Sequence, residues 1–104
     1  MSTETEIGRA GEGHAITWLK TEGYSVKLNS QPHSPTTIEA QSDSKRLLVQ
    51  VITTVYPNTP NRLSAEEEKL LTSRATELGA QAWEARVQIG PKLELVGNVL
   101  WRRI

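Results

Sequence analysis

The fold of this chain is decided by one stretch near its middle, Leu47-Leu48-Val49-Gln50-Val51-Ile52-Thr53. Alternate residues of a strand point to opposite faces of a sheet, and this stretch has apolar residues on both of its faces. A strand with two apolar faces is covered on both sides, which is typical of the centre of a sheet. We therefore expect residues 46–54 to form the central strand of a mixed sheet with a helix packed on each face.

The rest of the chain supplies the elements that would surround this strand. A helix is expected over residues 5–22, with a Ser or Thr N-cap among residues 2–5 and Gly23 at its end. Ser64 and Glu67 form the capping box of a second helix, which is expected to run to Leu78. Strands are expected at residues 24–28, 36–41 and 82–89, with weaker candidates at 93–96 and 99–101 and a proline-containing turn at 29–35. The predicted fold is α/β in the order α-β-β-β-α-β-(β), as one domain over residues 1–104.

Composition narrows the classes of function. The 12 basic and 12 acidic residues give no formal net charge, which argues against indiscriminate binding to polyanions. There is no cysteine, and therefore neither a disulfide nor a thiolate metal site. No apolar run approaches the roughly 20 residues that span a bilayer, and the first six residues are too polar and acidic for a signal peptide. We expect a cytoplasmic protein with no membrane partner.

Three short motifs lie on these elements. Gly8-Arg9-Ala10-Gly11-Glu12 opens the first helix, Thr37-Ile38-Glu39-Ala40 lies on the second strand, and Gln50-Val51-Ile52 lies on the third. This layout resembles the PD-(D/E)XK nuclease superfamily, particularly its small members related to Holliday junction resolvases and to predicted bacterial endonucleases. The resemblance spans Gly8 to about Ile89. It implies a restriction-endonuclease-like fold and Mg²⁺-dependent cleavage of DNA.

The resemblance also implies a site from which two charged groups are missing. Thr37 stands where the superfamily has a metal-binding Asp, and Ile52 stands where it has a Lys. Strand alternation places Thr37, Glu39, Gln50 and Ile52 on one face of the sheet, and we expect Glu12 to reach that face from the first helix. Glu12 and Glu39 are the only charged members and the candidate metal ligands. Gln50 offers a carbonyl oxygen, and Gln occupies this place in some active members.

Each candidate also has a simpler interpretation. Glu12 and Glu39 are either residual ligands or solvated residues, and Ile52 is most simply a core residue that fills the former site. The candidates for contact with nucleic acid are Arg9, Lys69, Arg102 and Arg103, although charged helix faces and a charged C-terminal tail are usually just solvated. His14 and His33 have no zinc-site spacing and are expected to be structural or exposed.

Three functions remain open. The first is a nuclease-fold pseudoenzyme, without a cofactor, that binds DNA or a protein in DNA metabolism or defence. The second is an active Mg²⁺-dependent endonuclease with a rearranged site built from Glu12, Glu39 and Gln50. The third is a homodimerisation or scaffold module with no role in nucleic-acid binding. The missing charges favour the first of these over the second.

Overall fold

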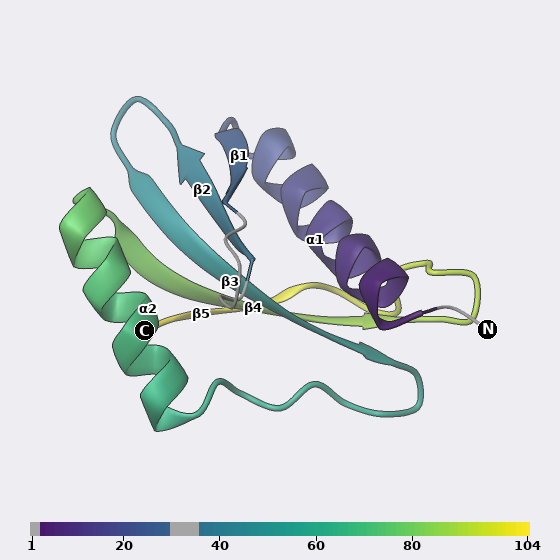
Figure 1. Ribbon diagram of the computed structural model, residues 1–104. Helices are drawn as coiled ribbons and strands as arrows, with labels where there is room; N and C mark the ends of the chain where they lie inside the picture. Colours follow the sequence, from purple (N-terminus) through teal and green to yellow (C-terminus); the bar gives the residue numbers. More distant parts are fainter. Residues whose placement is uncertain (1–2, 30–35) are drawn as a thin grey trace.

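The computed structural model describes residues 3–29 and 36–104, which form two helices and five strands (Figure 1). In chain order these elements are α1 (Glu4–Thr21), β1 (Ser25–Asn29), β2 (Thr37–Gln41), β3 (Arg46–Val55), α2 (Ala65–Leu78), β4 (Gln81–Ile89) and β5 (Leu100–Arg103). The predicted order is confirmed for the first six elements. Most of the expected turn at residues 29–35 lies outside the described residues.

The described strands form one mixed sheet in the order β1-β2-β3-β4-β5. β3 is central, as its two-sided apolar pattern predicted. It pairs antiparallel with β2 and parallel with β4, and the β1–β2 and β4–β5 pairs are antiparallel. The parallel connection from β3 to β4 passes through α2, as a crossover between parallel strands requires.

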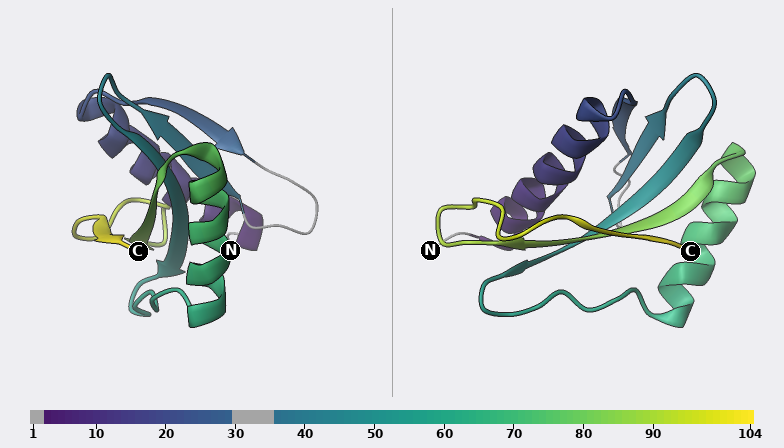
Figure 2. Two further views of the ribbon diagram at one scale, coloured as in Figure 1. Left: turned by 90° about the vertical axis from the view of Figure 1, so that its left-hand side faces the viewer. Right: turned by 180° about the vertical axis from the view of Figure 1, so that it is seen from behind.

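The two helices lie on opposite faces of the sheet (Figure 2, left). α1 packs its Ala15 and Leu19 on a buried cluster that includes Ile38, Val49 and Ala85. α2 packs on the other face, over a second cluster whose members are Leu48, Leu63, Leu71, Ala75 and Ala82. We call these the α1 face and the α2 face. β3 contributes residues to both clusters, so its alternation divides the protein into two core layers.

Local chemistry explains where the helices begin and end. Thr3 and Glu6 exchange backbone-to-side-chain hydrogen bonds of 3.2 Å in a capping box, and Ser64 and Glu67 do the same for α2. Gly79 ends α2 with φ +66°, in the left-handed region that glycine tolerates. Among the described residues, no helix combines the length and apolar composition that crossing a bilayer requires.

The C-terminal segment differs from expectation. The weak strand candidate at residues 93–96 forms only an isolated bridge between Ile89 and Leu95. The candidate at 99–101 is instead β5, which begins at Leu100 and continues through Arg103. Arg102 and Arg103 therefore belong to a paired strand and not to a charged tail.

α1 lies close against β3 at Gly11. A Cβ atom on Gly11 would fall inside the side chain of Thr53 on β3, whereas a Cβ on Gly8 or Gly13 would meet nothing. We expect Gly11→Ala to lower the free energy of unfolding by about 2 kcal/mol, because the helix must move away from the sheet. Gly13→Ala is the matched control, expected to stabilise by about 0.5–1 kcal/mol through helix propensity. Urea unfolding checks both, and a stabilised Gly11→Ala variant would contradict this packing.

Candidate functional site

Two of the expected site residues, Thr37 on β2 and Gln50 on β3, belong to a row of polar side chains that crosses the sheet. Thr37 is the register partner of Gln50, Gln50 is the partner of Glu84 on β4, and Glu84 is the partner of Arg102 on β5. Register partners share a face, so all four side chains lie on the α2 face. Thr37, Gln50 and Glu84 are buried. We call these four residues the polar row.

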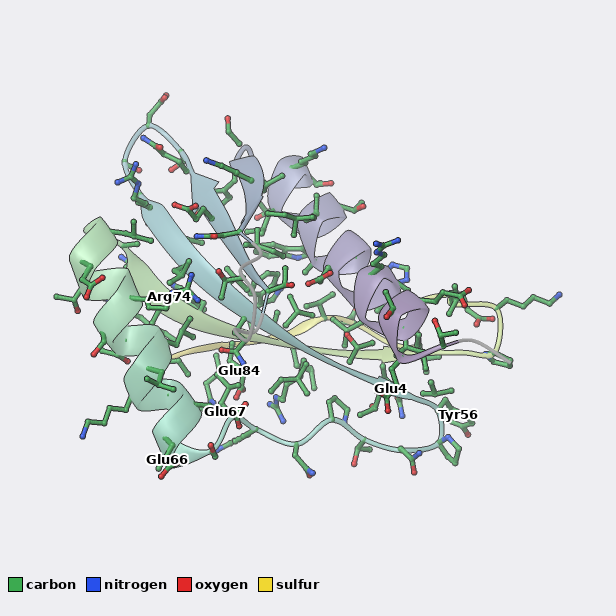
Figure 3. All side chains as sticks on the ribbon, viewed as in Figure 1. Glu4, Tyr56, Glu66, Glu67, Arg74 and Glu84 are labelled. Carbon is green, nitrogen blue, oxygen red and sulfur yellow. The ribbon has the colours of Figure 1, made fainter. Side chains whose placement is uncertain are left out.

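Glu84 is the centre of the polar row and has no exposed surface. One of its oxygens, Oε1, accepts the backbone N–H of Leu63 at 2.7 Å. Arg102 binds both oxygens, donating from Nε to Oε2 and from Nη2 to Oε1, each at 3.0 Å. Arg86 Nε lies 3.3 Å from Oε2. Figure 3 shows Glu84 between the sheet and the chain that leads into α2. The carboxylate is therefore fully enclosed by donors from the described residues.

These contacts keep Glu84 ionised. Burial by itself raises the pKa of Glu84, but the hydrogen bonds from Arg102 and Leu63 and the charges of Arg102 and Arg86 outweigh burial and lower the pKa below its ordinary value. The same pairing raises the pKa of Arg102, first through its hydrogen bond with Glu84 and then through that with Glu68. The pair is a bidentate carboxylate–guanidinium contact, which is the strongest geometry for such a bond.

Arg102 also fastens α2 to the sheet. Its Nη2 forms an ion pair with Glu68, on the first turns of α2, so one guanidinium joins β5, β4 and the helix. The expectation that Arg102 lies in a solvated tail is wrong, because Arg102 is in β5 and its Nε and Nη2 are bound by two carboxylates. Contact between Arg102 and nucleic acid stays a prediction. Arg103 follows on the opposite face of β5, exposed, as the register partner of Trp83.

Ile52 lies two residues beyond Gln50 on the α2 face and is half-buried against the α2 cluster. Its register partner on β4 is Arg86. The first helix, from which Glu12 was expected to reach this face, therefore does not cover Ile52, because α1 packs on the other face of β3. The interpretation of Ile52 as a core residue agrees with its packing, although the helix above it is α2.

Thr37 and Glu39 occupy the far end of the same face. The Thr37 hydroxyl is buried and has no hydrogen-bond partner among the described residues. Glu39 is half-buried, and its Oε2 accepts the side-chain amide of Asn29 at 3.4 Å. Its register partner on β3 is Leu48, which belongs to the α2 cluster. Glu39 therefore has a polar contact on β1 but an apolar neighbour toward the centre of the sheet.

Glu12 does not join these residues, and the expectation that it reaches the face of Thr37 and Gln50 is wrong. Glu12 lines a groove on the α1 face that has a volume of about 450 Å³. Gly8, Val51 and Thr53 line the same groove. Burial raises the pKa of Glu12, and the charge of Arg9 offsets part of that rise. The sheet itself separates Glu12 from Gln50.

The donor set does not fit a divalent metal ion. Mg²⁺ requires several oxygen ligands that converge on one point, and the two candidate ligands, Glu12 and Glu39, lie on opposite faces. Within residues 3–29 and 36–104, no group of three His, Asp or Glu side chains is placed to hold a metal ion. His14 Nε2 is instead 2.9 Å from the carbonyl oxygen of Leu93, and His33 lies outside the described residues.

The expected nucleic-acid contacts are also dispersed. Arg9 is exposed on α1 and Lys69 is exposed on α2, in layers separated by the sheet. Arg102 is held within the polar row, and Arg103 points to the other side of β5. These four cations do not form one basic surface.

Sequence reasoning missed Glu84 and Arg86. The alternation of Glu84, Arg86 and Gln88 with apolar residues in the predicted strand was the available signal, since it places two charged groups on one face beside β3. The partner Arg102 lies 18 residues further on, just beyond the weak strand candidate at 99–101, so its pairing was hidden. No protein-family model matches this chain, and no curated protein is significantly similar to it.

Proposed function

We propose that this chain is a nuclease-fold protein that has lost catalysis and acts as a nucleic-acid-binding or protein-binding subunit in DNA metabolism or defence. The α-β-β-β-α-β order supports this proposal, because it matches the order implied by the resemblance to PD-(D/E)XK nucleases. The position of Gln50 and Ile52 on the central strand of a mixed sheet supports it as well. Fold alone does not establish function, which depends on the chemistry of the site.

The observation that carries the proposal is the closed polar row. Hydrolysis of a phosphodiester by this class of enzyme requires an open position for a metal ion, a phosphate and a water molecule. Here Thr37 and Gln50 are buried, Ile52 packs beneath α2, and the carboxylate of Glu84 is already neutralised by Arg102. A charge-balanced, enclosed row of this kind supports a structural role for the former site.

A cleavage assay tests the loss of catalysis. We expect no Mg²⁺- or Mn²⁺-dependent cleavage of duplex, branched or single-stranded DNA by the purified protein. The loss of one transition-state stabiliser costs about 10²–10³ in rate, and here both an anionic ligand and a cation are replaced. Products are resolved on denaturing gels with end-labelled substrates, and EDTA serves as the metal control.

Two variants distinguish true cleavage from a contaminant. Metal-dependent cleavage that disappears in Glu39→Ala but persists in Glu12→Ala would overturn the proposal, because Glu39 is on the face of Gln50 and Glu12 is not. Cleavage unaffected by Glu39→Ala comes from another protein in the preparation. Metal-dependent cleavage gained by combining Thr37→Asp with Ile52→Lys would support the proposed descent from a nuclease.

A further inference from the structure

The aromatic residues of this chain are concentrated in one groove on the α1 face. The chain has three Trp, two Tyr and no Phe, and four of these five aromatic residues line the same groove. The groove has a volume of about 420 Å³, within the range of small-ligand sites. We call it the tryptophan groove, and the residues that matter for its chemistry are Trp18, Trp83, Trp101, Tyr24, Lys45 and Gln81.

The rings of this groove do more than fill the core. Trp18 lies on α1 with 41% of its surface exposed, although a ring serving only the core would be buried. Its ring packs on that of Trp101, with centroids 4.8 Å apart and planes inclined at 39°. That contact from β5 fixes the exposed ring in place. A fixed, exposed indole presents a flat apolar surface to a ligand with little loss of side-chain entropy.

The groove also has polar groups at its walls. Gln81 Oε1 accepts the indole N–H of Trp83 at 3.2 Å, which orients that ring. The indole N–H of Trp101 is buried and has no partner among the described residues. That nitrogen is closed to solvent, so its missing bond is a cost within the packed structure and not a contact for a ligand in the groove. The polar groups that line the groove beside its rings are the amide of Gln81 and the amine of Lys45, and they suit a planar ring with polar edges better than a purely apolar chain.

The charges around the groove select among planar ligands. Lys45 belongs to the lining, and Arg103 is the register partner of Trp83 on the same face, whereas Glu22 is the one acidic lining residue. The balance of these three groups is cationic. A quaternary ammonium ligand would be repelled by Lys45, while a ring that bears a phosphate would be attracted to it.

We infer that the tryptophan groove binds a nucleobase, with the attached phosphate beside Lys45. Stacking on aromatic side chains together with cationic contacts to phosphate is how single strands are held without sequence readout. The inference rests on the nucleic-acid branch of the proposed function, and it places binding on the face opposite the polar row. The base belongs either to a single strand or to a free nucleotide, which share this chemistry.

Fluorescence anisotropy with a labelled single-stranded thymidine decamer tests the inference. We expect saturable binding to the full chain, weakened about tenfold or more in Trp18→Ala and largely recovered in Trp18→Phe. Tyr56→Ala is the matched control, since Tyr56 is 60% exposed but lies near Glu4, at the other end of α1 (Figure 3). Lys45→Gln should weaken binding and flatten its dependence on salt, and Lys92→Gln, an exposed lysine outside the groove, should do neither.

Competition experiments identify the source of the base. If thymidine monophosphate competes as well as the unlabelled decamer, the ligand is a free nucleotide. If only the decamer competes, the ligand is a single strand. Either result supports the inference that the groove binds a nucleobase. Decamer binding that is unchanged in Trp18→Ala would overturn the groove but leave the nucleic-acid function intact. If the wild-type protein binds neither decamer nor nucleotide, the inference about the groove is overturned, and the protein-binding branch of the proposed function is left standing. Circular dichroism of each variant confirms that the fold is retained.

Discussion

Replacing Glu84 with glutamine is expected to lower the free energy of unfolding by about 3 kcal/mol at neutral pH. The substitution keeps the size of the side chain but removes the charge that three neighbouring groups were arranged to meet. Arg102 loses its bidentate partner, and Arg86 loses the anion beside its Nε. Leaving cations without their buried anion is costly, because their own burial is no longer compensated. Urea unfolding followed by circular dichroism measures the change.

The same residue predicts how stability depends on pH. The pKa of Glu84 is lower in the folded protein than in the unfolded chain, where it is about 4.3. Its contribution is therefore complete above the unfolded pKa and is lost as the pH falls through the folded pKa. We expect the stability difference between wild type and Glu84→Gln to be largest at neutral pH and to shrink in acid below about pH 4.3. A difference that stays constant over this acid range would contradict the pairing.

Glu12 provides a matched control with the opposite sign. Burial raises the pKa of Glu12 in the folded protein, so its charge opposes folding at neutral pH and that penalty disappears as the pH falls through the raised value. Glu12→Gln is therefore expected to leave stability unchanged or slightly increased at neutral pH. A large loss on this substitution would mean that the carboxylate of Glu12 has a stabilising partner on the α1 face.

The outline of the fold was predictable because its signals are local. The two-sided apolar pattern of β3 and the capping boxes at Thr3 and Ser64 depend only on residues close together in the chain. They set the element order and most boundaries to within a residue or two. The clustering of three glycines in α1 was equally visible, but only packing singles out Gly11 as the one beneath Thr53.

The candidate site was less predictable because it depends on relations between distant elements. The alternation of side chains along β3 shows which of its residues share a face. It does not show which helix covers that face, because both helices have an apolar stripe. Glu12 was therefore assigned to the wrong side of the sheet. The pairing of Glu84 with Arg102 depends on the register between β4 and β5, and sequence spacing does not fix that register.

Substituting lysine for Ile52 tests whether this position, where the resemblance to PD-(D/E)XK nucleases implies a lysine, is closed to water. We expect Ile52→Lys to lower the free energy of unfolding by about 3 kcal/mol. The substitution removes apolar contact with the α2 cluster and places a second cation beside Arg86, the register partner of Ile52. The nearest anion, Glu84, is already bound by Arg102, so it is not available to the new lysine.

Two further variants separate burial from charge repulsion. Ile52→Met keeps the apolar volume and should cost less than about 1.5 kcal/mol. Adding Arg86→Gln to Ile52→Lys should recover part of the loss if repulsion between the two cations contributes, because register partners of like charge destabilise a sheet. An unchanged urea midpoint in Ile52→Lys alone would mean that the lysine reaches water. The face beneath α2 would then still have an open position at Ile52, and the proposed loss of catalysis would rest on the missing carboxylate at Thr37 alone.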